Sequence, residues 1–568
     1  MKKSIILAMA ATALVLGGCN KLLDKEPRDK FINNPSFWSN QKQVENYCNS
    51  FYENFPSYGT GGTYGEFYFL SLGDDQVNPN FDNWAYTAVP GSTTDWNKPF
   101  TEIRRANYLI NNLTTSTLSE SERDYYTAIG RLNRAYQYFK LVRAYGDVQW
   151  LEEVPLNDDP NDPLVQGART DRDVVIDKVI EDIDFAIDHL GSGNKMVWSK
   201  DMALAMKSDI CLYEGTYCKY RTAADNGKAA DAARANNYLN LCVNACEQLM
   251  DAGYSLCANY GDIYNSLDLK SNTEIIFMRN YEKDVLGHST VDYTTGSTAQ
   301  RGLSKDAFDA FLFTDGKPLA TTSLDKSDVA TLDANGYYSI EGPLAVRDKR
   351  LGVLIDHVLA FKGHGYARDA ALAEMTSPTG YTIAKYDNDK MGDTNSTKNY
   401  YRNQIGNGYT DGPIYWLAVI YLNYAEAKAE LGSCTDADLN RSVNLLQARA
   451  GLPALTTSPA VDPANDWDIS SLLWEIRRAR RCELMTDKGY RYWDLVRWHK
   501  LDKLDTNKYP NIALGANMSA VTDCEVDLKD GYAIGNAATR TYDKKYYFYP
   551  VPSNQLSLNK SCTQNPGW

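Results

Sequence analysis

Hydrophobic residues recur at intervals of three and four positions along most of the chain after residue 100. Within residues 119–146 the repeated positions are Ala128, Leu132, Ala135, Phe139 and Val142. This spacing places side chains on one face of an α-helix, so it predicts amphipathic helices rather than strands. Similar stripes predict helices over residues 101–113, 173–190, 201–220, 238–252, 414–431 and 438–450.

The predicted helices follow one another as hairpins with short connections. Small residues such as Ala135, Ala203 and Ala425 fall where paired helices must approach closely. Hairpins that recur at intervals of roughly 34 to 40 residues are typical of tetratricopeptide-like repeats, whose apolar faces are buried only by stacking on neighbouring repeats. We therefore expect a mainly α-helical repeat scaffold.

Two segments depart from the helical pattern. Residues 58–96 are dense in Gly, Asn, Asp, Tyr and Trp, and residues from about 255 to 413 are rich in Gly, Asp, Thr and Tyr. The second segment is too long for one loop, so it predicts an irregular, loop-rich lobe inserted between helices. The first predicts an exposed loop that displays its aromatic side chains.

Arginines and large aromatic residues are concentrated in residues 474–500, WEIRRARRCELMTDKGYRYWDLVRWHK. Apolar positions on either side of Gly489 predict two helical arms joined by a turn. Arginine binds carboxylates through two parallel hydrogen bonds and stacks on aromatic rings, which favours a structural network that locks helices together. A phosphate or nucleic-acid site fits poorly with a formal net charge of -14, so we expect no nucleic-acid partner.

The N-terminus has the pattern of a bacterial lipoprotein signal. Two lysines precede an apolar run, which ends in Leu16-Gly17-Gly18-Cys19. Small residues before a cysteine form a lipobox, so residues 1–18 are expected to be removed and Cys19 to carry lipid. Residues 19–40 are then the lipidated N-terminus and tether. The chain after Cys19 has no run of eighteen apolar residues that would predict a further membrane span.

The composition is typical of an exported globular protein with a recognition surface. Hydrophobic residues make up 43% of the 568 positions, and the chain holds 40 Tyr and 11 Trp against 16 Phe. Tyrosine and tryptophan combine an apolar face with a hydrogen-bonding edge, which suits binding to sugar rings. Ten cysteines follow Cys19 without a CxxC pair, and the five histidines are widely separated. We therefore expect neither a metal site nor a cofactor, although one disulfide is compatible with export.

Several motifs together resemble the SusD/RagB family of Bacteroidetes surface lipoproteins. ELMTDKGYRYWDLVRW (residues 483–498) is similar to the C-terminal signature of that family. AFDAFLFTDGKPL (307–319), VRDKRL (346–351) and the closing QNPGW (564–568) match further landmarks in the same order. The matches therefore run from Cys19 to Trp568 in the order expected for the family. The resemblance implies a SusD-like domain over residues 41–568.

This resemblance implies about four tetratricopeptide-like helix pairs that support the loop-rich lobe. It also implies a protein without catalytic activity, anchored by lipid in the outer membrane and facing the extracellular side. Such proteins hold an oligosaccharide ligand for import by a SusC-like TonB-dependent transporter. In RagB-like members the captured nutrient is a peptide, which remains the alternative.

The resemblance also places the ligand site at residues 58–96. Within this loop the candidate ligand-binding residues are Trp84, Tyr86, Asn83, Asp74 and Asp75. Aromatic faces stack on sugar rings while polar side chains bond their hydroxyl groups. Trp96 is a further candidate, although its place at the start of the first helix favours a packing role.

The inserted lobe is expected to supply a second group of ligand contacts. These candidates lie in the polar stretch before Ala307 and comprise Tyr281, His288, Tyr293 and Arg301. We expect them to face the first loop across a shallow groove. The alternative for each is a loop residue that packs on its own neighbours.

A glycoside hydrolase is a remote alternative, in which Asp74 and Asp75 act as paired carboxylates. The catalytic carboxyl groups of such enzymes stand roughly 5 to 9.5 Å apart on opposite sides of the scissile bond, which adjacent loop residues seldom achieve. The structure distinguishes the two binding alternatives. A flat exposed platform of Trp84 and Tyr86 favours glycan, whereas a groove with unpaired backbone groups favours an extended peptide.

The lipobox predicts that Cys19→Ala releases the protein from the membrane, because the thiol that carries the lipid is lost. Fractionation of cells that express the variant should find it outside the membrane fraction. An unchanged distribution would refute the lipid anchor.

Overall fold

The computed structural model describes residues 35–68, 72–78, 84–154, 162–295 and 301–568, and it is mainly α-helical, as predicted. Cys19 and Asn83 lie outside the described residues. The main helices of the scaffold are α5 (Thr94–Leu113), α6 (Glu120–Tyr145), α8 (Arg172–His189), α9 (Lys200–Tyr220), α11 (Ala232–Met250), α17 (Leu417–Glu430), α20 (Ser471–Glu483) and α21 (Tyr490–Arg497). Within the described residues α5–α6, α8–α9 and α11–α17 form packed pairs, while α20 packs on α17 and α21 packs on α9.

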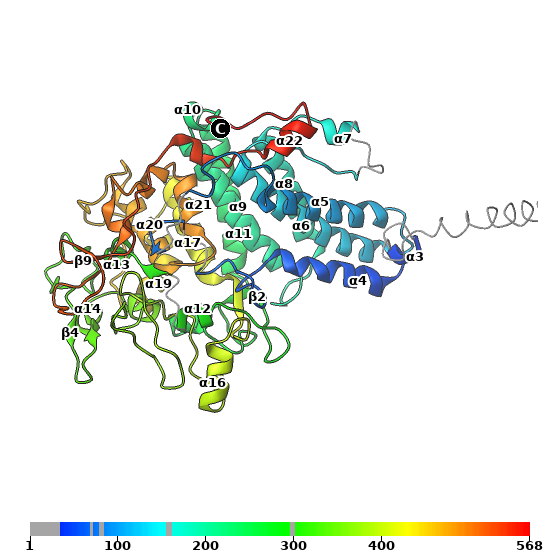
Figure 1. Cartoon of the computed structure of the whole chain (residues 1–568). Helices are drawn as coiled ribbons and strands as arrows, with labels where there is room; N and C mark the ends of the chain where they lie inside the picture. Colours follow the sequence, from blue (N-terminus) through cyan, green and yellow to red (C-terminus); the bar gives the residue numbers. More distant parts are fainter. Residues whose placement is uncertain (1–34, 69–71, 79–83, 155–161, 296–300) are drawn as a thin grey trace, which may run out of the picture.

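The helices stack in the order of the chain. Helix α6 packs between α5 and α8, α9 contacts both α8 and α11, and α17 joins α11 to α20 (Figure 1). Two glycines inside helices permit this close approach. A Cβ atom on Gly130 of α6 would lie 3.0 Å from Ile110 of α5, and one on Gly215 of α9 would lie 2.7 Å from Leu239 of α11. A side chain at either position would therefore force the facing residue to shift.

Local sequence signals set the ends of these helices. The Ser119 side chain accepts a hydrogen bond from the Glu122 backbone, and the Glu122 carboxylate accepts one from the Ser119 backbone, which is the capping box of α6. Gly146 follows α6 with a φ of 72°, a conformation that glycine adopts without strain. The helix predicted over residues 438–450 is divided into α18 (Asp436–Asn440) and α19 (Val443–Arg449), because the backbone at Ser442 leaves the helical region.

The remaining helices are short. They are α3 (Pro35–Trp38), α4 (Gln41–Asn49), α7 (Pro163–Gln166), α10 (Ala223–Asn226), α12 (Asp292–Thr295), α13 (Lys305–Ala310), α14 (Glu341–Ala345), α15 (Lys349–Leu354), α16 (Asn395–Arg402) and α22 (Ser553–Leu558). Among the described residues, no helix combines the length and the hydrophobicity that crossing a membrane requires.

The chain between α11 and α17 forms a lobe of loops and short elements at the lower left of Figure 1. Strands β2 (Ile275–Arg279) and β6 (Gly412–Trp416) pair antiparallel where the chain enters and leaves this lobe. Strand β1 (Gln76–Val77) of the first loop pairs with β3 (Gly302–Leu303) of the lobe. Two further small sheets lie within the described residues. One pairs β4 (Thr331–Leu332) with β5 (Tyr338–Ser339), and the other places β9 (Tyr532–Ile534) between β7 (Leu514–Asn517) and β8 (Leu528–Lys529).

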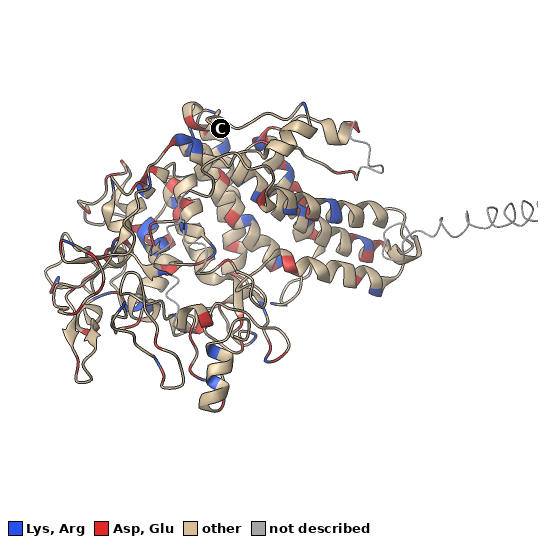
Figure 2. Cartoon of the chain, in the orientation of Figure 1, with Lys and Arg blue, Asp and Glu red and all other residues tan. Residues whose placement is uncertain are grey.

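Helices α20 and α21 carry the predicted network of arginines and carboxylates. Arg497 donates two hydrogen bonds of 2.7 Å to Glu426 of α17, and the Trp498 indole nitrogen donates to the same carboxylate at 2.6 Å. Arg480 of α20 donates to Asp494 of α21 at 2.8 Å. Lys and Arg lie among Asp and Glu throughout this region (Figure 2). The network therefore joins α17, α20 and α21, as the arginine pattern predicted.

The same kind of pairing ties the lobe to the scaffold. Arg350 of the lobe donates to the buried Glu483 of α20 at 2.8 Å, and Arg449 donates to Glu483 and to Glu274 of the lobe. All of these side chains are almost fully withdrawn from solvent. A buried charge without its partner is costly, so each pair restricts how the two parts fit together.

Glu426 gives a test of this network. Burial alone would raise the pKa of Glu426, but the guanidinium groups of Arg497, Arg477 and Arg480 lower it from 4.5 to about 2. The lowered pKa contributes stability above about pH 4.5 that is lost as the pH falls towards 2. Glu426→Gln should therefore lower the free energy of unfolding by about 3 kcal/mol near pH 7, and the difference should shrink below about pH 4.5.

Chemical denaturation of both proteins across this pH range measures the difference. Glu45→Gln on the exposed side of α4 is the matched control, since it removes one carboxylate without breaking a buried pair. Equal stability of Glu426→Gln and the unaltered protein at neutral pH would contradict a structural role for the network.

Candidate ligand-binding groove

A groove of about 730 Å³ opens where the first loop, the scaffold and the lobe meet. The first loop contributes Tyr64, Glu66 and Trp84, and the lobe contributes Arg301. The scaffold side chains come from three helices and the C-terminal segment: Asp95 and Lys98 from α5, Lys140 and Arg143 from α6, Tyr492 and Trp493 from α21, and Tyr549. The groove thus gathers aromatic and charged side chains from segments that are far apart in sequence.

Trp493 forms the aromatic wall of the groove. Gly489 takes a left-handed φ of 63° at the start of α21, and this turn directs the helix with Trp493 towards the groove. The Trp493 ring is partly exposed, and the Arg143 guanidinium lies 4.3 Å from its centroid. The exposed Tyr64 ring also lines the groove and lies 6.2 Å from the Tyr293 ring of the lobe.

The start of α5 is fixed against the first loop. Thr93 caps the helix by accepting a hydrogen bond from the Asp95 backbone. The Tyr86 hydroxyl lies 2.6 Å from the Thr93 hydroxyl and donates to the Asp95 carboxylate at 2.6 Å. Tyr86 is half-buried and packs edge-on against Tyr549. It therefore positions a wall of the groove rather than presenting an open ring face.

Trp84 lines the groove but is 95% buried, since its exposed fraction is 5%. Its ring stacks on Tyr546 with the centroids 4.2 Å apart, and its indole nitrogen donates to the Thr541 carbonyl at 2.8 Å. Trp84 and Tyr86 therefore do not form the flat exposed platform that we expected. The reason is tertiary: the C-terminal segment covers the ring that the loop was expected to display.

Asp74 and Asp75 are buried in ion pairs instead of facing a ligand from an exposed loop. Arg491 donates two hydrogen bonds of 2.7 Å to Asp74, and Arg481 donates to Asp75 at 2.8 Å. Burial acts to raise the pKa of Asp74, but Arg481 and Arg491 hold it well below its usual value. Burial raises the pKa of Asp75. The carboxylates therefore join the first loop to α20 and α21.

Two of the lobe candidates are also buried. The Tyr281 hydroxyl donates to the Gly59 carbonyl at 2.5 Å, and a ring nitrogen of His288 lies 3.0 Å from the Thr410 carbonyl oxygen. Burial lowers the pKa of His288 to about 3, so the ring is neutral at physiological pH. These two residues take the packing role that was the alternative, and the expectation that they face the groove is wrong.

The groove also contains residues that were not among the candidates. Lys98, Lys140 and Arg143 occupy polar positions on α5 and α6, and Trp493 belongs to the arginine-rich stretch. Lys140 and Arg143 are three positions apart, which places them on one helical face. This spacing was visible in the sequence, but only the fold shows that the face borders a groove.

Comparisons with known proteins decide the family. A sequence profile of the SusD family matches residues 273–568, and a profile described as starch-binding associating with outer membrane matches residues 21–212. The chain belongs to the SusD family. A SusD-like protein of Bacteroides ovatus is 23% identical over 295 residues, which are 49% of this chain and 50% of that protein. The chain thus spans about half the length of the curated relatives it matches.

Solved structures show the same tetratricopeptide-like fold over nearly the whole chain. A SusD-like protein of Bacteroides fragilis NCTC 9343 is 23% identical with a TM-score of 0.68, covering 96% of this chain and 100% of that one. A SusD-like carbohydrate binding protein of the same strain is 18% identical with a TM-score of 0.69, covering 93% and 99%. At these identities the likeness establishes the fold alone.

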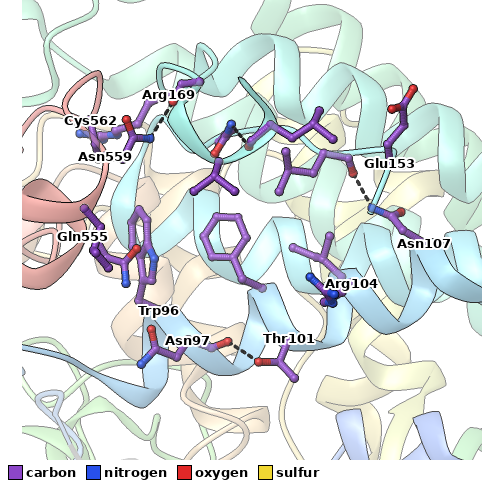
Figure 3. A pocket seen from close by; sticks show the side chains of 18 residues that line it. Trp96, Asn97, Thr101, Arg104, Asn107, Glu153, Arg169, Gln555, Asn559 and Cys562 are labelled. Atoms are coloured by element: carbon purple, nitrogen blue, oxygen red, sulfur yellow. Dashed lines mark hydrogen bonds between the residues drawn. The ribbon is translucent and has the colours of Figure 1, made fainter. Parts of the chain in front are cut away.

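A second pocket of about 480 Å³ lies on the other side of α5 in this SusD-family protein, between α5, α7 and α22. Figure 3 shows Trp96, Asn97 and Thr101 of α5 on one wall and Gln555 and Asn559 on another. Trp96 is only 7% exposed and packs edge-on against Tyr145 at 4.9 Å. Its observed contacts match the packing role that its place at the start of α5 favoured.

One cluster of acidic and thiol side chains within the described residues has the composition of a metal site. Asp173, Glu214 and Cys218 place ligand-type atoms close together, but Arg172 and Arg234 form ion pairs with Glu214 at 2.5 and 2.9 Å. The Glu214 carboxylate is thus engaged by two arginines. The ten cysteines within the described part of the chain are all free thiols.

Proposed function

We propose that this SusD-family protein binds a glycan in the groove beside Trp493 and delivers it, unmodified, to a SusC-like TonB-dependent transporter. The observation that carries the proposal is the partly exposed Trp493 ring in a groove whose lining combines apolar, charged and hydroxyl-bearing side chains. Sugar rings offer an apolar face for stacking and a rim of hydroxyl groups for hydrogen bonding. The carbohydrate-binding relative of Bacteroides fragilis with the same fold supports this assignment.

The size of the groove suits a short stretch of a glycan chain. Small-molecule pockets are usually about 300–1,000 Å³ in volume, and this groove of about 730 Å³ lies within that range. Its walls come from helices and from a loop fixed by ion pairs, so the groove is formed before a ligand arrives. A preformed site loses less conformational entropy on binding.

The groove does not resemble the active site of a glycoside hydrolase. Glu66 and Asp95 are its acidic lining residues, and each accepts a hydrogen bond from a tyrosine hydroxyl. Asp95 is exposed and Glu66 is half-exposed, whereas a general acid is typically kept protonated by an apolar pocket. The geometry supports capture without chemical modification.

Peptide capture receives less support from the groove. Binding an extended peptide through its backbone needs an open strand edge. The groove walls are the helices α5, α6 and α21 together with loops, and helices satisfy most of their backbone groups internally. Side-chain recognition is therefore the available mode.

The proposed location follows from the sequence and the family. The lipobox at Cys19 supplies an anchor, and the profile matched by residues 21–212 is described as associating with outer membrane. We place the protein on the extracellular face of the outer membrane, where a large glycan is accessible before transport.

Calorimetry against a panel of plant, host and microbial oligosaccharides tests the proposal. Trp493→Ala should weaken binding of the recognised glycan by at least about 2 kcal/mol, because an aromatic ring at the centre of a site is typically a hot spot. Trp474→Ala is the matched control, since Trp474 is also partly buried but does not line the groove. The melting temperature of each variant, compared with that of the unaltered protein, establishes that the variant is folded.

Unchanged affinity in folded Trp493→Ala would place the ligand elsewhere. Absence of heat across the whole panel, together with binding of a peptide mixture, would replace glycan capture by the RagB-like alternative.

A further inference from the structure

We infer that the groove selects anionic glycans, whose sugar residues carry carboxylate or sulfate groups. This inference rests on the proposed function and names the substrate class of the same site. Four cationic side chains line the groove, Lys98, Lys140, Arg143 and Arg301, against the two acidic side chains of Glu66 and Asp95. The excess of positive charge occurs in a chain whose formal net charge is -14.

Three of these cations lack an acidic partner. Within the described part of the chain, no carboxylate lies within ion-pair distance of Lys98, Lys140 or Arg143. The arginines of residues 477–497 differ in this respect, since each of them pairs with a carboxylate, as Arg478 does with Asp462 and Glu475. The arginines of residues 477–497 are therefore neutralised by carboxylates, whereas Lys98, Lys140 and Arg143 at the groove are not.

Arg143 is held in a fixed orientation without being neutralised. Its guanidinium lies 4.3 Å from the centroid of Trp493 and 5.2 Å from that of Phe139. Its buried Nε finds no hydrogen-bond acceptor among the described residues. The aromatic contacts restrict the orientation of the planar guanidinium group, while its N–H groups remain free to donate hydrogen bonds. A guanidinium held in this way can bind a carboxylate or sulfate in a defined geometry.

Lys140 lies one helical turn before Arg143 and is also incompletely solvated. It is half-buried, and its ammonium lies 5.4 Å from the Tyr136 ring centroid. Burial lowers the pKa of Lys140, and the positive charges of Arg143 and Lys98 lower it further, while Glu66 and Asp95 act in the opposite direction. An anion bound between these cations would relieve their repulsion, because opposite charges stabilise each other most in a partly desolvated site.

The aromatic wall and the cations act together in this arrangement. The Arg143 guanidinium lies over one face of the Trp493 ring, 4.3 Å from its centroid, so the part of the ring that Arg143 leaves uncovered is available to one sugar residue. Arg143 and Lys140 line the same groove and can meet an acidic substituent of that sugar. A planar carboxylate suits two parallel hydrogen bonds from Arg143, whereas a sulfate is also bound well by the point charge of a lysine. Carboxylated and sulfated glycans both carry negative charge, so matched probes are needed to distinguish them.

Two pairs of probes isolate the charge from the sugar backbone. The first pair is an oligogalacturonide and its methyl ester, and the second is a carrageenan oligosaccharide and its desulfated form. Calorimetry with the mature chain carrying Cys19→Ala should show that the charged member of at least one pair binds about tenfold or more tightly than its neutral partner. Binding should weaken as the salt concentration rises from about 50 to about 500 mM.

Variants assign the preference to the groove. Arg143→Gln and Lys140→Gln should each weaken binding of the charged probe by about tenfold, and Lys140→Arg should restore most of it. Lys42→Gln on the exposed side of α4 removes the same charge elsewhere and should leave the affinity unchanged. Melting temperatures establish that each variant is folded.

The outcomes separate this inference from the proposed function. Equal binding of charged and neutral partners, with Trp493→Ala still losing affinity, would overturn the charge preference and leave glycan binding intact. Charge-dependent binding that survives Arg143→Gln with Lys140→Gln would also overturn the inference, because the anion would be bound elsewhere. If neither probe pair binds, the charge preference is also overturned. Binding of the neutral glycan panel then decides whether the groove binds glycans at all.

Discussion

The buried pairing of arginines with carboxylates is the constraint on which the rest of this structure depends. Arg491 and Arg481 hold Asp74 and Asp75 of the first loop, and Arg497 holds Glu426 of the scaffold. Removing charges from water is costly, so such pairs add little net stability, but breaking one typically costs about 3–5 kcal/mol. They consequently act mainly by excluding other ways of packing the loop, the scaffold and the lobe.

The groove is a consequence of that arrangement. Its loop wall is fixed through the pairing of Asp74 with Arg491, and its α21 wall through the pairing of Asp494 with Arg480 of α20. The pairing of β1 with β3 joins the loop to the lobe. Within this fixed frame Arg143 and Lys140 lack carboxylate partners among the described residues. Basic residues thus have two roles in this protein. Arginines paired with carboxylates fix the shape of the groove, and cations without a carboxylate partner are available to pair with an anionic ligand.

The sequence predicted the features that depend on nearby residues. Periodicity predicted the helices, Ser119 and Glu122 predicted the start of α6, and the arginine-rich stretch predicted an ion network. The candidate site depended on contacts that periodicity does not encode. Arg491 meets Asp74 from 417 residues away, and Tyr546 covers the Trp84 ring. A loop rich in aromatic and acidic residues was therefore interpreted as an exposed binding surface, although the fold buries much of it.

A crystal structure of the protein with a bound acidic oligosaccharide tests the central claim most directly. We expect a sugar ring in contact with Trp493, with its carboxylate or sulfate within hydrogen-bond distance of Arg143 or Lys140. Asp74 and Asp75 should keep their arginine partners in the complex. A ligand bound in the pocket beside Trp96, or one that displaces Arg491 from Asp74, would contradict the division between structural and ligand-binding charges.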